Sequence, residues 1–337
     1  MIRQTSIGSP APFGLVAPSV LTADTIRNVK SLAGLLALLL LPAVAGAKPV
    51  ALVGPKVDVV CSDMAVAANG SAVVGWGEGQ ETITLVAASR ARRRHPVKVA
   101  LGSVDGSFPV VQTLGHVREA TCPQLATDAS GNAIAAWEDD RGRVRVAERQ
   151  ANSRFGAARA VSGRKSAELS VASAASGAAA IAWLSRRGKI EVIVRQPGAP
   201  FAAPVALPAT EPAALEVAVN ERGSVLVTDE EDHSRARVWL SQAGRHFGPA
   251  EGIPGSALLT SYVTTALGAD DSVVALLNGP RGHETGIDVT FRPPGARFAA
   301  PRPLTRSGDF ARVAADAAGN FTAAWTAYTG DGHPAGV

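Results

Sequence analysis

The 337-residue sequence has few aromatic residues, which form 5% of the chain, and it contains only two cysteines and two tyrosines. Since 46% of the residues are hydrophobic, a core is possible, but it must be built mostly from alanine, valine and leucine. No Cys-x-x-Cys or H-E-x-x-H spacing occurs, and the six histidines are scattered. The sequence therefore predicts no metal site.

Catalytic signatures are also missing. The sequence has neither a G-x-S-x-G nucleophile elbow nor a phosphate-cradling glycine loop. Two acidic stretches, "EDDRG" (138–142) and "DEEDH" (229–233), lie at the same turn in two copies of a sequence repeat that is described below. Clustered carboxylates can bind Ca²⁺, which needs six or more oxygen ligands at a tight bend, but solvated turns explain these stretches better. We expect no cofactor and no enzyme activity.

One apolar run stands apart from the rest of the chain. The stretch 31–47, "SLAGLLALLLLPAVAGA", follows Arg27 and Lys30 and ends in an A-x-A pattern. This arrangement predicts a secretory signal peptide over residues 1–47, with an unusually long lead before it. A retained membrane anchor is the alternative, although the run from Leu32 to Leu41 is short for a membrane span. The mature chain is then expected to be secreted, with no membrane span.

Charge gives little information about a partner. The whole chain has 33 basic and 29 acidic residues, and residues 1–47 hold Arg3, Arg27 and Lys30 against Asp24. The remaining 30 basic and 28 acidic residues nearly balance. We therefore expect no nucleic-acid partner.

The sequence repeats one phrase six times. "LATDASGNAIAAWED" (125–139) and "VAADAAGNFTAAWTA" (313–327) are near-copies, and four weaker copies lie elsewhere. We call the turn residue of each copy its anchor; successive anchors are 61, 46, 46, 48 and 48 residues apart. The anchors are Gly70, Gly131, Gly177, Gly223, Asp271 and Gly319. Six residues later, four copies have a tryptophan, namely Trp76, Trp137, Trp183 and Trp325.

Each unit contains four short segments separated by turns. The third segment alternates apolar and polar residues, as in "KIEVIVRQ" (189–196), and a closing phrase contains phenylalanine, as in "PFAAPVALP" (200–208). An alanine-rich helix is the alternative, but a central glycine and the missing 3.6-residue period oppose it. Four antiparallel strands with a period of about 47 residues predict an all-β fold, a six-bladed β-propeller over residues 48–337. The tryptophans are expected to pack between blades, with a ligand platform as the alternative.

The pattern resembles the Ala- and Gly-rich propeller repeats of secreted proteins from high-GC bacteria, which are loosely grouped with sialidase-like or WD-repeat propellers. The resemblance covers residues 49–337 and lies in the D/N-x-x-G-N-x-x-x-x-W and F-x-x-P-x-x-L phrases. The WD and kelch signatures are absent, and the sialidase Asp box is not matched. The resemblance implies blades but no specific function.

The last unit stops after its second strand and turn. Residues 48–54, "KPVALVG", match the closing strand "APVALPA" (203–209) of another unit. We therefore predict that this N-terminal strand completes the sixth blade and covers an open edge. A truncated gene product is the alternative.

The two cysteines occupy equivalent positions in neighbouring units. Cys61 and Cys122 each lie nine residues before their anchor, at the start of the innermost strand. Innermost strands converge on the axis, so the two residues are expected to form a disulfide in an oxidising compartment. Two unpaired buried thiols are the alternative.

The first interval is some 14 residues longer than the others, and the excess contains the densest charge run in the chain. We expect a protruding loop between the third and fourth strands, and such a loop on a rigid scaffold is a candidate binding element. An acidic cell-surface polymer or a protein is the expected partner, and a solvated insertion is the alternative. The candidate binding residues are Arg90, Arg92, Arg93, Arg94 and Lys98.

These features predict a secreted, non-catalytic binding or scaffold propeller whose ligand is unknown. The alternative is a secreted glycoside hydrolase or lyase, sialidase-like, with its site at the mouth of the axial channel. A sialidase needs an arginine triad and a nucleophilic tyrosine paired with a carboxylate, and Tyr262 is the tyrosine expected near the mouth. A channel lined only by alanine, serine and valine would exclude the enzyme.

Overall fold

The computed structural model describes residues 2–7, 51–54, 57, 59–78, 94–103, 105–117, 122–163, 167–209, 212–231, 235–256, 262–281 and 284–327. All the regular elements named in these ranges are β-strands. The strands form six antiparallel sheets, five with four strands and one with three. The predicted β-propeller with a period of about 47 residues is therefore confirmed.

Chain order and spatial order agree in the first five sheets, where each strand pairs with the next. The first sheet contains β2 (Val59–Val66), β3 (Ala72–Glu78), β4 (His95–Gly102) and β5 (Val110–Val117). The second contains β6 (Gln124–Thr127), β7 (Ala133–Glu138), β8 (Val144–Arg149) and β9 (Arg159–Ala160). The third contains β10 (Ala167–Ser173), β11 (Ala179–Leu184), β12 (Ile190–Arg195) and β13 (Val205–Leu207).

The remaining sheets follow the same plan. The fourth sheet contains β14 (Pro212–Val219), β15 (Val225–Glu231), β16 (Arg235–Ser241) and β17 (Glu251–Gly252). The fifth contains β18 (Val263–Leu267), β19 (Val273–Arg281), β20 (Glu284–Arg292) and β21 (Arg302–Thr305). The sixth contains β22 (Asp309–Ala315), β23 (Phe321–Thr326) and β1 (Ile2–Ile7).

The anchors form the tight turn between the first and second strand of each sheet. Gly131, for example, has φ of +86°, and its amide donates to the carbonyl of Asp128. Glycine adopts this left-handed conformation without the steric cost that a side chain brings. Asp271 takes the same conformation in the fifth sheet, with φ of +71°, because aspartate is among the residues that tolerate it best.

The hydrophobic core lies between the sheets. Trp183 of the third sheet is fully buried in a cluster with Ile134 and Val146 of the second sheet. Trp137 lies in a cluster with Val97 and Val117 of the first sheet. Small residues fill the second strands, as in "AIAAW" of β7, so neighbouring sheets approach closely there. Trp76 and Trp325 are buried as well.

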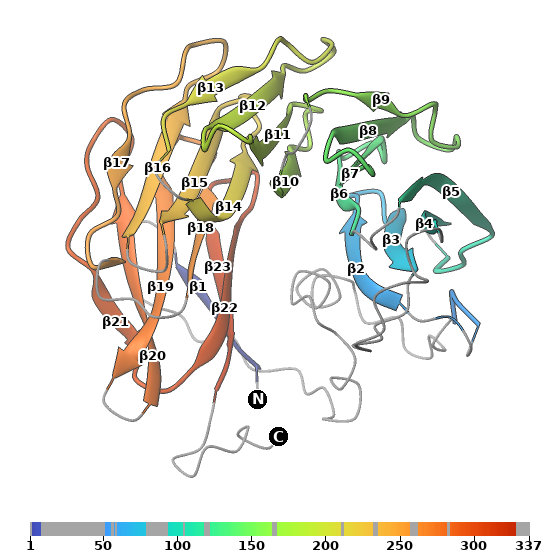
Figure 1. The fold of residues 1–337 in the computed structure, drawn as a ribbon. Helices are drawn as coiled ribbons and strands as arrows, with labels where there is room; N and C mark the ends of the chain where they lie inside the picture. Colours follow the sequence, from blue (N-terminus) through green and yellow to red (C-terminus); the bar gives the residue numbers. More distant parts are fainter. Residues whose placement is uncertain are drawn as a thin grey trace, which may run out of the picture.

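The first strand of each sheet contacts the first strand of the next. These contacts join β2 to β6, β6 to β10, β10 to β14, β14 to β18 and β18 to β22. Figure 1 shows the sheets following one another around a curved path, with the blue and green first sheets at one end and the red sixth sheet at the other. The first strands are thus the innermost strands of the propeller.

The N-terminal strand of the sixth sheet is not the predicted one. β1 pairs antiparallel with β23, from Ile2 opposite Thr326 to Ile7 opposite Phe321, and takes the place of a third strand. The predicted strand was 48–54, and its described residues, 51–54, lie outside any strand. Residues 48–54 match a fourth strand, which can pair only after a third is in place. β1 therefore pairs with the edge of β23, the position that a third strand occupies in the other sheets.

The basic insertion also differs from its prediction. His95–Gly102 is β4, the third strand of the first sheet, and it pairs with β3 along its length. The inserted residues therefore lie between the second and third strands, and not between the third and fourth. Val97 and Val99 explain this placement, because their period-two alternation puts both side chains into the core, where they are fully buried.

Candidate ligand-binding site

Six polar side chains line one cavity at the centre of the propeller. Each lies seven residues before the anchor of its unit, on the first strand of its sheet, so the six occupy one register of the repeat. The cavity has a volume of about 460 Å³. We call these residues the polar belt; they are Asp63, Gln124, Ser170, Glu216, Thr264 and Arg312.

Several belt residues connect one sheet to the next. In each case the side-chain oxygen accepts a hydrogen bond from a backbone amide in the first strand of the following sheet. Such bonds to buried amides satisfy groups that would otherwise be costly to bury. The bonds are Leu125 N to Asp63 Oδ2 at 2.7 Å, Val217 N to Ser170 Oγ at 3.0 Å and Thr265 N to Glu216 Oε2 at 2.9 Å.

Burial controls the charge of the belt carboxyls. Burial raises the pKa of Asp63 to about 6, against the opposing effect of hydrogen bonds from the amides of Leu125 and Met64. Burial also raises the pKa of Glu216, while the Thr265 amide and the positive charge of Arg312 act in the opposite direction. The belt therefore combines carboxyls that are costly to ionise with one cation.

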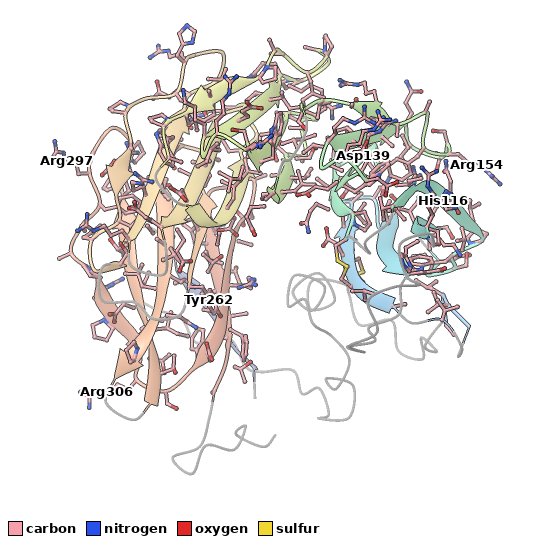
Figure 2. All side chains as sticks on the ribbon, in the orientation of Figure 1. His116, Asp139, Arg154, Tyr262, Arg297 and Arg306 are labelled. Atoms are coloured by element: carbon pink, nitrogen blue, oxygen red, sulfur yellow. A yellow bond between two sulfur atoms is a disulfide. The ribbon has the colours of Figure 1, made fainter. Side chains whose placement is uncertain are left out.

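Tyr262, which Figure 2 labels, and Arg312 both line the cavity wall. The guanidinium carbon of Arg312 is 5.4 Å from the centroid of the Tyr262 ring, a cation–π contact. Burial raises the pKa of Tyr262 well above its ordinary value. A tyrosine nucleophile needs its phenol to lose a proton easily, so this environment opposes that role.

The cavity meets only part of the requirements for a sialidase. Glu230 also lines it, so the channel is not restricted to alanine, serine and valine. Among the described residues that line it, however, Arg312 is the only arginine, whereas the sialidase interpretation needs three. The geometry thus provides polar ligand contacts without an arginine triad.

A second pair of carboxyls lies between the second and third sheets. Burial and the negative charge of Glu168 raise the pKa of Glu138 to about 7. Burial raises the pKa of Glu168 too. Glu168 has φ of +45°, a strained conformation for a residue with a side chain.

The cysteines form the predicted disulfide. Cys61 and Cys122 are bonded with their Cα atoms 5.6 Å apart, and both residues line the axial cavity. The bond joins the first strand of the first sheet to the segment that leads into β6. The disulfide prediction is confirmed.

The predicted basic residues are placed only in part. Arg94 forms an ion pair with Asp140 at 3.4 Å, and Lys98 forms one with Glu78 at 2.8 Å. Neither residue lines the axial cavity within the part of the chain that the structure describes. Arg90, Arg92 and Arg93 lie outside the described residues.

Each acidic stretch contains an ion-paired carboxylate, so the two stretches are not simply solvated. Asp229 stands where other units have tryptophan, and its buried side chain pairs with Arg237 at 2.6 Å. Asp139 pairs with Arg143 at 2.6 Å. Across the described ranges, no three histidine, cysteine, aspartate or glutamate side chains gather closely enough to hold a metal ion.

Sequence reasoning missed the polar belt. Its members share polarity and not identity, so an alignment built on repeated Gly, Trp and Phe does not reveal them. The detectable signal was six polar residues at one register of otherwise apolar strands.

No protein-family model matches the sequence, and no curated protein matches it. Among solved structures, the chain resembles the BP39L lectin from Burkholderia pseudomallei, with a TM-score of 0.54 and 10% identity over 81% of this chain and 78% of that one. AofleA from Arthrobotrys oligospora gives a TM-score of 0.49 and 12% identity over 79% of each chain. The Hadza microbial sialidase Hz136 gives 0.45 and 10% identity over 78% of this chain and 64% of that one. The first resemblance supports the propeller fold.

Proposed function

We propose that this protein is a secreted, non-catalytic propeller that binds a glycan in its axial cavity. The polar belt is the observation that carries this proposal, because it gathers hydrogen-bond donors and acceptors from all six sheets around one cavity. Sugar hydroxyls donate to carboxylates and accept from guanidinium and amide groups. The name of the BP39L structure, a lectin, supports the same class of ligand.

The charges of the cavity favour a neutral or basic sugar. Among the described residues that line it, Asp63, Glu216 and Glu230 outnumber one cation, Arg312. An acidic sugar placed there would bring a further negative charge close to carboxyls in a medium of low polarity. Tyr262 adds an aromatic ring to the wall.

A glycan array with the purified protein tests this proposal, and Gln124→Leu is the most informative variant. Gln124 lines the cavity, and its side chain makes no hydrogen bond to another described residue, so the substitution removes a ligand contact without breaking the belt. We expect roughly tenfold weaker binding of the array hit, because a buried sugar hydroxyl loses its partner. Binding is measured by titration calorimetry.

The matched control is Gln150→Leu, the same chemical change at an exposed residue outside the cavity. We expect it to bind like the unchanged protein. An array without hits, or equal affinities for the protein and for Gln124→Leu, would contradict the proposal. Melting temperatures of both variants equal to that of the unchanged protein show that neither change acts through folding.

A glycoside hydrolase is the second candidate, and the raised pKa of Asp63 is the observation that favours it. A carboxyl that keeps its proton near pH 6 can act as a general acid. Incubating the array hit with the protein and assaying reducing ends tests this function. If the unchanged protein releases reducing ends and Asp63→Asn does not, the hydrolase is established. If the glycan stays intact after incubation with the unchanged protein, hydrolysis of that ligand is excluded.

Export is the remaining part of the proposal. The apolar run before Ala47 and a disulfide, which persists in oxidising compartments, both support it. None of the described residues forms a helix long and apolar enough to cross a membrane. The intact mass of protein recovered from the culture medium should equal that of residues 48–337. A mass that includes residues 2–7 would contradict cleavage after residue 47. The exported protein would then still contain β1.

A further inference from the structure

A second cavity, distinct from the axial one, lies at the outer side of the junction between the first and second sheets. It has a volume of about 370 Å³, and residues of β5 and β8 and of the turn before β8 line it. His116 and Asp139, both labelled in Figure 2, line this cavity. We call its basic residues the basic cleft; they are Arg94, His116, Arg141, Arg143 and Arg145.

The cleft has more positive than negative charge. Four arginines line it against Asp139 and Asp140, which leaves a formal charge of +2 with His116 neutral. Asp139 is engaged by Arg143, whose Nε donates at 2.8 Å and whose second nitrogen lies 2.6 Å away. Arg145 donates to the carbonyl of Ala158 at 2.6 Å, a neutral acceptor that does not cancel its charge.

Two further arginines present their charge outward. Arg94 contacts Asp140 at 3.4 Å, but its side chain is 66% exposed while that of Asp140 is 16% exposed. Arg141 is exposed, and only its backbone amide is bonded to Asp139. Exposed guanidinium groups at the rim of a cavity bind carboxylate, sulfate and phosphate oxygens in pairs.

The floor of the cleft is apolar and closely packed. Gly115 of β5 has no side chain, and a Cβ there would lie 3.2 Å from Cζ2 of Trp137. The glycine therefore lets the indole lie directly against the β5 backbone. Trp137 and Leu114 thus form a rigid surface beneath the arginines.

The basic insertion ends at this cavity. Arg94 is the last residue of the run Arg90–Arg94 and lies in the cleft, immediately before β4. Arg92 and Arg93 directly precede it in the sequence. Arg94 therefore places the end of the basic run in the sequence at the cleft.

We propose that the basic cleft binds the anionic groups of an acidic polysaccharide. The site is separate from the axial cavity, whose carboxyls favour a neutral or basic sugar, so the protein has two binding sites of opposite preference. A long polymer offers repeated anionic groups, which match several arginines along one rim.

Arg94→Ala with Arg141→Ala tests the proposal in the full-length protein. The matched control is Arg186→Ala with Arg187→Ala, which removes the same charge from two exposed residues in the equivalent turn of the third sheet, outside both the basic cleft and the axial cavity. Immobilised heparin and polygalacturonate are the probes, and neutral dextran is the blank. We expect roughly tenfold weaker binding for the cleft variant alone.

Equal losses in the two double variants would mean that net charge, and not the cleft, governs retention, and would overturn the proposal. Unchanged binding in the cleft variant would also overturn it. Binding of heparin but not polygalacturonate restricts the proposal to sulfated polymers, and competition by duplex DNA at equal charge would replace the polysaccharide with nucleic acid. Binding of the neutral array hit should be unchanged in both variants, so this experiment fails or succeeds independently of the axial site.

Discussion

Replacing Cys61 and Cys122 with serine is expected to lower the free energy of unfolding by about 4 kcal/mol. The two residues are 61 positions apart, and a bond across a loop of this length restricts the unfolded chain strongly. The hydrogen bond from the Leu125 amide to Asp63 spans the same junction between sheets. The double variant should therefore remain folded while it unfolds at a lower concentration of guanidinium chloride.

Reduced wild-type protein is the control for this prediction. It should unfold together with the double serine variant, because both lack the bond and differ only in two sulfur atoms. Coincident curves for oxidised wild type and the variant would show that the bond adds no stability. If the double variant does not fold at all, the disulfide contributes more to the free energy of unfolding than the chain-entropy argument predicts.

Trp183→Ala is expected to destabilise the protein by about 3–5 kcal/mol, as is typical when a buried aromatic side chain is truncated. Trp183 is fully buried between the second and third sheets, and its Nε1 donates to Glu191 Oε2 at 2.9 Å. The truncation leaves a cavity among Ile134, Val146 and their neighbours, because strands on both sides cannot collapse into it. Equilibrium unfolding in guanidinium chloride measures the change.

Trp183→Phe separates packing from hydrogen bonding. It keeps most of the ring volume and removes the donor to Glu191, so we expect a smaller loss than for alanine. Similar losses for both variants would show that the hydrogen bond, and not the packing, dominates. A loss below about 1 kcal/mol for alanine would contradict the packing role of the repeated tryptophan.

The repeat made the sheets, their turns and the disulfide predictable from the sequence. The anchors Gly131 and Asp271 mark turns whose backbone conformation few residues tolerate, so local chemistry was enough to find them. Cys61 and Cys122 were matched because they share a register. Where each unit repeats a steric requirement, one alignment predicts the succession of sheets.

The errors occurred where backbone, and not side chains, decides the pairing. β1 adds to the edge of β23 through main-chain hydrogen bonds, which almost any sequence can make, so its side chains gave no signal. At the end of the insertion, the alternation of Val97 and Val99 makes β4 a strand, although dense positive charge directly precedes it in the sequence. The axial site was missed because its residues differ from unit to unit.

The belt hydrogen bonds have a consequence for how such a chain can change over generations. Asp63, Ser170 and Glu216 each accept from a main-chain amide of the next sheet. Every residue except proline provides that amide, so the junction places almost no demand on the neighbour's side chains. A unit copied, lost or exchanged by recombination would meet a compatible neighbour at once. At these three junctions the belt position needs only an acceptor oxygen, which aspartate, serine and glutamate all provide, so the rest of the side chain can diverge while the bond between sheets is kept.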